Sequence, residues 1–203
     1  MNIWLNFLVD SLAFGATFMY GSTGEILTEK AGHLNLGIPG IMCMGGAGGC
    51  LVLNLIGKSG LPAPIIVILG ILGSLAAAMR MGLIYSFLTV TLRANQNVTG
   101  LALTTFGAGL DQSITTESVG GQGFTAIMVS WLAKFDPLVM LLTAGLISLL
   151  NQGAAQISQD FNVSGAFPDV IVGIILFFII GSEFFITYQI IFTRKGAGKE
   201  AVK

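Results

Sequence analysis

The sequence predicts an all-α fold, a polytopic bundle of transmembrane helices with re-entrant or broken segments. Of its 203 residues, 54% are hydrophobic and only 9% are charged, whereas soluble domains carry roughly 25% charged residues. The long apolar runs do not alternate in polarity as the strands of a membrane barrel do. Nine Lys and Arg against ten Asp and Glu leave no basic surface for nucleic acid. We expect one transmembrane domain over residues 1–203.

The first spans follow from runs of apolar residues, because about 20 of them cross the hydrocarbon core as a helix. Ile3–Tyr20 is the first run, and the segment Gly21–Gly40 after it is polar and rich in turn-forming residues. No Lys or Arg precedes Lys30, so we expect the first run to stay as a span and not to be cleaved as a signal peptide. Ile41–Gly57 and Pro62–Met79 follow, with small residues that allow close helix packing.

The second half of the chain holds shorter and more broken runs. Arg80–Arg93 is apolar between its two cations and is too short to cross alone, so it extends the third helix or lies at the interface. The remaining segments, in order, are the Thr- and Gly-rich run Asn97–Leu110, the loop Asp111–Gly123, the run Thr125–Leu150, the polar loop Asn151–Phe167 and the run Val170–Phe192.

Orientation follows from the excess of Lys and Arg in cytoplasmic segments. Four cations in the basic tail 193–203 place the C-terminus in the cytoplasm, and the cations of Arg80–Arg93 place that segment there too. The loops 111–123 and 151–167 contain no Lys or Arg and belong outside. Thr125–Leu150 is then a hairpin broken at Asp136-Pro137. The alternative is a single crossing, with the charge rule failing for these weakly charged loops.

No residue pattern for catalysis, a cofactor or a metal is present. Gly57-Lys58-Ser59 is similar to the end of a phosphate-binding loop, but Val52 stands where its first Gly is required. His33 is the only histidine, and Cys43 and Cys50 lie in an apolar run without it, so no metal site is complete. We therefore expect no catalytic residue, no cofactor and no metal, and a membrane-embedded enzyme ranks last among the functions considered.

Three stretches share a pattern with a known family. They are 24–45, 92–103 (Leu-Arg-Ala-Asn-Gln-Asn-Val-Thr-Gly-Leu-Ala-Leu) and 120–126 (Gly-Gly-Gln-Gly-Phe-Thr-Ala). The set resembles the permease subunits of bacterial ABC importers of the ribose, nucleoside and branched-chain amino acid type, in the simple-sugar and nucleoside branch. The family's first motif is matched by Glu29, Lys30, Gly32, Asn35, Gly37, Gly40 and Met42.

The resemblance implies a function and a set of partners. The chain would be a multi-pass permease of the bacterial cell membrane that translocates a nucleoside or simple sugar. It would work with a separate ABC ATPase subunit, a second permease subunit as homo- or heterodimer, and an extracytoplasmic substrate-binding protein. Two departures stand against the family pattern. Pro39 replaces an acid, and the middle of the chain is shortened near 111–119. The alternative is therefore a shortened, non-transporting remnant or regulatory membrane protein.

Candidate site residues follow from the chemistry of a neutral polyol, whose hydroxyls need hydrogen-bond partners across the bilayer. The candidates for the substrate path are Asn35, Asn95, Gln96, Asn97, Thr99 and Phe124. The alternative for each polar one is a helix cap or an interhelical hydrogen bond. The backbone motif adds Gly121 and Gly123 in the third stretch. Asp10 and Glu183 are acids within apolar runs and are functional candidates because such charges are costly in lipid.

Overall fold

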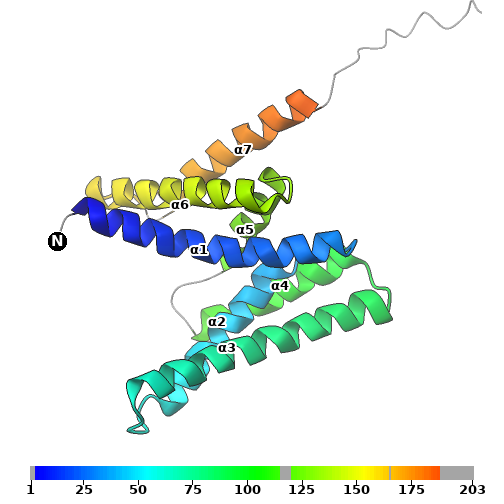
Figure 1. The fold of residues 1–203 in the computed structure, drawn as a ribbon, viewed down its shortest axis with the longest axis vertical. Coiled ribbons are helices and arrows are strands. Elements are labelled where there is room, and N and C mark those ends of the chain that lie inside the picture. Colours follow the sequence, from blue (N-terminus) through cyan, green and yellow to red (C-terminus); the bar gives the residue numbers. More distant parts are fainter. Residues whose placement is uncertain (1–2, 115–119, 165, 188–203) are drawn as a thin grey trace, which may run out of the picture. The chain divides into compact units, whose positions relative to one another are not determined.

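The computed structural model describes residues 3–114, 120–164 and 166–187 (Figure 1). The chain divides into two compact units, residues 1–152 and 153–203, which are described separately. The elements are α1 (Ile3–Lys30), α2 (Ile38–Ile56), α3 (Ala63–Ser86), a π-helix η1 (Phe87–Thr91), α4 (Gln96–Ile114), α5 (Gly120–Leu132), α6 (Pro137–Asp160) and α7 (Phe167–Thr187).

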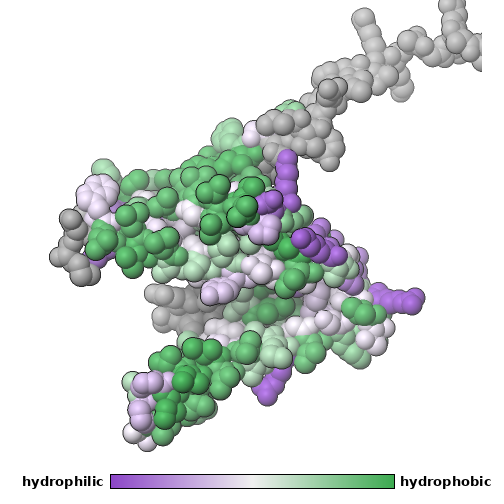
Figure 2. Space-filling view, in the orientation of Figure 1, coloured by the Kyte–Doolittle hydropathy of each residue, from purple (hydrophilic) through white to green (hydrophobic). Residues whose placement is uncertain are grey.

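The all-α fold class is confirmed, since every element of the described part is a helix. Three helical segments in that part are long and apolar enough to cross a membrane: Ile38–Ile56, Ala63–Thr91 and Pro137–Asp160. Asp169–Ile179 is a shorter apolar helix. Large apolar side chains are exposed along these helices, and Figure 2 shows apolar residues over much of the visible face. In lipid such exposure carries no penalty.

Helix α1 is longer than the run that predicted it. It continues past Tyr20 to Lys30, so the first ten residues of the segment expected to be turn-rich, 21–30, are helical. Gly32 then adopts a φ of +82°, a left-handed conformation that glycine tolerates and that commonly follows a helix. The turn between α1 and α2 is thereby confined to residues 31–37, and we call this segment the 31–37 turn.

Two predictions about helix boundaries are confirmed. The segment Arg80–Arg93 extends the third helix, because α3 passes into η1 and the two form one span of 29 residues. The chain also breaks at Asp136-Pro137. Asp136 begins α6 as its cap, since its Oδ1 accepts hydrogen bonds from the N–H groups of Leu138 and Val139 at 2.9 and 3.1 Å. The membrane sidedness of this break stays a prediction.

Two expected loops are shorter than predicted. The loop 111–123 loses residues to both neighbours, because α4 runs to Ile114 and α5 begins at Gly120. Gly121 and Gly123 consequently lie in a helix. The loop 151–167 begins only after Asp160, where α6 ends. Polar residues of both predicted loops, such as Gln112 and Gln156, instead lie in helices within the described part.

Helix α2 packs against α3 (Figure 1). Small residues of both helices lie at this contact. A Cβ added to Gly73 would lie 2.5 Å from a methyl group of Val52. The hydroxyl of Ser74 donates to the carbonyl of Gly45 at 2.7 Å. Close backbone approach of this kind is the usual basis of helix association in lipid, where apolar surface gains nothing by leaving its solvent.

Helix α2 also contacts α4 and α5 with its first turn. A Cβ on Gly40 would lie 2.6 Å from the Cα of Thr104, and one on Gly107 would lie 2.7 Å from the Cα of Gly40. A Cβ on Gly123 would lie 2.8 Å from the Cβ of Pro39. Because α2 is held against three helices, the 31–37 turn that precedes it is held with it.

The second unit contains the end of α6 and all of α7. The turn between them is closed by Ser158, whose hydroxyl lies 3.1 Å from the carbonyl of Val163 and 3.2 Å from that of Ser164. Asn162 has a φ of +53°, a conformation that asparagine adopts more readily than most residues. The basic tail 193–203, predicted to be cytoplasmic, lies outside the described residues.

The contact between α2 and α4 gives a first prediction. Gly40→Ala places a methyl group against the α4 backbone, which cannot move aside as a side chain does, and we expect a loss of about 1–3 kcal/mol of stability. Gly109→Ala on α4 is the matched control, because nothing lies within 4 Å of its added Cβ. Unfolding in detergent micelles measures both. Equal stabilities of the two variants would contradict the packing described here.

Candidate functional site

The 31–37 turn carries Asn35, the motif residue predicted for the substrate path. Asn35 is 4% exposed, and its Oδ1 accepts a hydrogen bond from the N–H of Gly37 at 2.9 Å. A side chain on Gly37 would meet the same Oδ1 at 3.0 Å and the Cα of Gly100 at 3.4 Å. The glycine thus lets the turn lie close to α4 while the Asn35 amide shapes the turn from within.

Side chains from α3 and α4 hold the backbone of this turn. Gln96 Oε1 accepts from the N–H of Leu34 at 3.1 Å, and Gln96 Nε2 lies 2.9 Å from Nδ1 of His33. The Tyr85 hydroxyl donates to the carbonyl of Leu34 at 2.9 Å. The Thr104 hydroxyl donates to the carbonyl of Leu36 at 2.8 Å. The turn therefore has hydrogen-bond partners for polar groups that the membrane would leave unsatisfied.

Glu25 lies on α1, beyond the predicted span Ile3–Tyr20, and its side chain is fully buried. Its Oε2 lies 3.5 Å from the hydroxyl of Thr28, and its Oε1 has no hydrogen-bond partner. Burial, followed by the negative charge of Glu29, raises the pKa of Glu25 to about 7. The Thr28 hydroxyl, the backbone of Asn35 and the side chain of Trp131 stabilise the ionised form and limit this rise.

A cavity of about 450 Å³ opens between α1, the 31–37 turn, α2 and α3. We call it the polar cavity, because six of its lining residues carry hydrogen-bonding side chains. These are Thr17, Tyr20, Thr28, Asn35, Tyr85 and Ser86. Side chains of these four types are uncharged in water at neutral pH. The cavity offers hydroxyl and amide groups beside apolar walls, which is the composition of sites for small neutral solutes.

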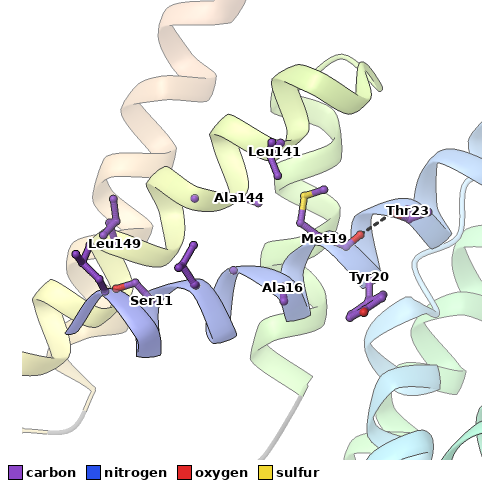
Figure 3. Close-up of a pocket in the computed structure, with 12 residues that line it drawn as sticks. Ser11, Ala16, Met19, Tyr20, Thr23, Leu141, Ala144 and Leu149 are labelled. Carbon is purple, nitrogen blue, oxygen red and sulfur yellow. Dashed lines mark hydrogen bonds between the residues drawn. The ribbon is translucent and has the colours of Figure 1, made fainter. Parts of the chain in front are cut away.

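A second cavity, of about 610 Å³, lies between α1 and α6. Figure 3 shows Leu141, Ala144 and Leu149 of α6 facing α1, with Met19 and Ser11 on the opposite wall. The hydroxyl of Ser148 joins the two helices by donating to the carbonyl of Ser11. The walls are mainly aliphatic, so this groove suits hydrocarbon and offers a polar solute few partners. The polar cavity is therefore the candidate site.

The other predicted path residues do not line the polar cavity. Asn95 caps α4, with its Oδ1 accepting from the N–H groups of Asn97 and Val98 at 3.0 and 3.1 Å. Gln96 acts on the cavity through the turn, as described above. Thr99 is buried, whereas Asn97 is exposed. Phe124 lies on α5 and is 40% exposed.

The remaining motif residues and the two predicted membrane acids lie in different surroundings. Lys30 is exposed at the end of α1, while Glu29 is half-buried with an Oε2 that has no hydrogen-bond partner. Gly121 has open space around its Cβ position. Of the two predicted membrane acids, Asp10 is exposed on α1. Glu183 lies in α7, and its side chain is outside the described residues.

Sequence reasoning did not single out Glu25, Thr28 or Tyr85 as site residues. Glu25 and Thr28 lie in the segment expected to be a turn, yet a helix continued from Tyr20 places positions 17, 20, 21, 24 and 28 on one face at three- and four-residue spacing. Those are the α1 positions that line the polar cavity. Extending the helical period past Tyr20 was the signal that would have found Thr28.

The sequence matches the family described as "Branched-chain amino acid transport system / permease component" over residues 7–188. The chain belongs to this permease family. It is 36% identical over 104 residues to the "Putative glucose ABC transporter permease protein TsgC13" of Haloferax volcanii. That alignment covers 51% of the chain but only 29% of the relative's length. No solved structure matches the chain.

Membership confirms the resemblance drawn from the three sequence stretches. The family match includes the 31–37 turn and the helices that line the polar cavity.

Among the described residues, no group of three or more His, Cys, Asp and Glu is placed to hold a metal ion.

The contacts of Gln96 with the 31–37 turn give a second prediction. Gln96→Ala removes the partners of the Leu34 N–H and the His33 ring, and we expect a loss of about 1 kcal/mol per hydrogen bond. Asn97→Ala, at the next and exposed position of α4, is the matched control and should change stability little. Thermal unfolding in detergent measures both variants. A Gln96 variant as stable as its control would mean that the turn does not depend on this amide.

Proposed function

We propose that the chain is the membrane-spanning permease subunit of an ABC importer for a simple sugar or nucleoside. ATP would be hydrolysed by a separate ATPase subunit, and an extracytoplasmic binding protein would deliver the solute. A second permease subunit, identical or homologous, would complete the pathway in a bacterial cell membrane, with the C-terminus cytoplasmic. The proposal assigns no covalent chemistry and no catalytic residue to this chain.

The polar cavity is the observation that carries the proposal. Its hydrogen-bonding groups are hydroxyls and one amide, which donate and accept alike and so fit the hydroxyls of a polyol. An anionic solute would need a cation there, and the lining contains none. A branched-chain amino acid would need partners for both of its charges. A neutral sugar or nucleoside is the solute class that hydroxyl and amide groups can bind without a charged partner.

Two lining hydroxyls give the third prediction. Thr17 and Ser86 line the polar cavity, and neither hydroxyl makes a hydrogen bond within the described part of the chain, so Thr17→Val and Ser86→Ala remove donors with little structural cost. Each lost bond to the solute is worth about 1 kcal/mol, which is about fivefold in apparent affinity. ATP-dependent uptake of labelled glucose and uridine into vesicles containing the chain and its transport partners measures the effect.

Thr105→Val on the exposed face of α4 is the control for loss of a threonine hydroxyl. Unchanged uptake in both cavity variants would remove this cavity from the solute path. Absence of ATP-dependent uptake for either solute would count against the transport function. Co-purification with the ATPase subunit separates the remaining alternative, because a shortened remnant without a coupling loop should not retain that subunit.

A further inference from the structure

Glu25 lies next to residues that line the polar cavity but does not line the cavity itself. Its sequence neighbour Gly24 and its helix neighbour Thr28 both line the cavity, whereas Glu25 itself is fully buried. The carboxyl lies against two polar groups of that wall. The hydroxyl of Thr28 is 3.5 Å from Oε2, and the backbone of Asn35 faces the same carboxyl.

The surroundings of this carboxyl offer no cation among the described residues. The ionisable group that acts on it is Glu29 of α1, and its own charge acts on Tyr85 of α3; both of these groups are acids. From α5 the carboxyl meets only the neutral side chain of Trp131. A carboxylate can only accept hydrogen bonds, whereas a protonated carboxyl also donates one. A buried charge without a cation is costly. The neighbours of Glu25 must therefore donate hydrogen bonds to it when it is ionised, and one of them can accept a hydrogen bond from it when it is protonated.

We propose that Glu25 is a positioning residue whose protonation state sets the geometry of Thr28 and Asn35 in the wall of the polar cavity. In the neutral state the carboxyl stays buried without drawing further donors toward it. Oε1 has no hydrogen-bond partner among the described residues, so in the ionised state it needs donors. The backbone N–H of Asn35 and the indole N–H of Trp131 are donors that act on this carboxyl. The pKa of about 7 places this change in the ordinary range of cellular pH.

The test uses Trp131 as a reporter of the carboxyl beside it. Trp4 is the other tryptophan and is 74% exposed on α1, so Trp4→Phe leaves the emission of Trp131 alone. We expect the emission of this variant, in dodecyl maltoside micelles, to change with a midpoint near pH 7. Adding Glu25→Gln should abolish the change. No change between pH 6 and 8, or a change that persists in the Glu25→Gln variant, would overturn the proposal.

Two further variants test whether the wall and the carboxyl are coupled. Glu29→Gln should lower the midpoint, because the charge of Glu29 disfavours ionisation of Glu25. Thr28→Val should raise it, because the Thr28 hydroxyl stabilises the carboxylate. A merely structural role for Glu25 predicts neither shift. A Thr28→Val midpoint equal to that of the parent would overturn the link between the carboxyl and the cavity wall.

The consequence for transport rests on the proposed function and is measured separately. Uptake should vary with pH through the same midpoint, and Glu25→Gln should make it independent of pH. Uptake that keeps its pH profile in that variant would overturn the positioning role. If no uptake occurs in the parent at any pH while the fluorescence titration behaves as expected, the transport function fails and the coupling of Glu25 to the cavity wall stands.

Discussion

The close approach of helix backbones at α2 is the constraint on which the rest of the first unit depends. In lipid a helix gains nothing by hiding apolar side chains, so association rests on van der Waals contact and hydrogen bonds between helices. Glycines on α2, α3 and α4 bring these backbones together at distances that leave no room for a Cβ. The hydroxyl of Ser74 adds a hydrogen bond from α3 to the backbone of α2. The start of α2 is thereby fixed against three neighbours.

That packing decides where the polar groups of the chain can lie. The 31–37 turn enters α2 directly, so a fixed α2 fixes the turn, and the amide of Asn35 is held at the cavity. Gln96, Tyr85 and Thr104 provide hydrogen-bond partners for backbone groups of Leu34 and Leu36 in the turn. The groove between α1 and α6 has a different character, because its helices meet mainly through aliphatic and small residues. The first unit therefore has two cavities that α1 helps to line, the polar cavity and the mainly aliphatic groove against α6.

Much of the fold was predictable because hydropathy and proline act locally. The helical class, the extension of the third helix and the break at Asp136 all follow from neighbouring residues in the sequence. The extent of α1 did not, because Glu25 and Thr28 are polar on a face that turns inward toward polar partners. Asn95 is the opposite case. Its side chain is chemically suited to bind a solute, but its Oδ1 instead accepts hydrogen bonds from N–H groups in the first turn of α4. Tyr85 contacts the turn from 51 residues away, and no local pattern carries that information.

The amide of Gln96 has a chemical consequence for the ring beside it. Because the N–H of Leu34 donates to Oε1, the amide must present its NH₂ group to His33. Nδ1 of that ring is then the acceptor and carries no hydrogen, which leaves the neutral tautomer protonated at Nε2. A single side chain of α4 thus orients both the backbone of Leu34 and the imidazole ring of His33.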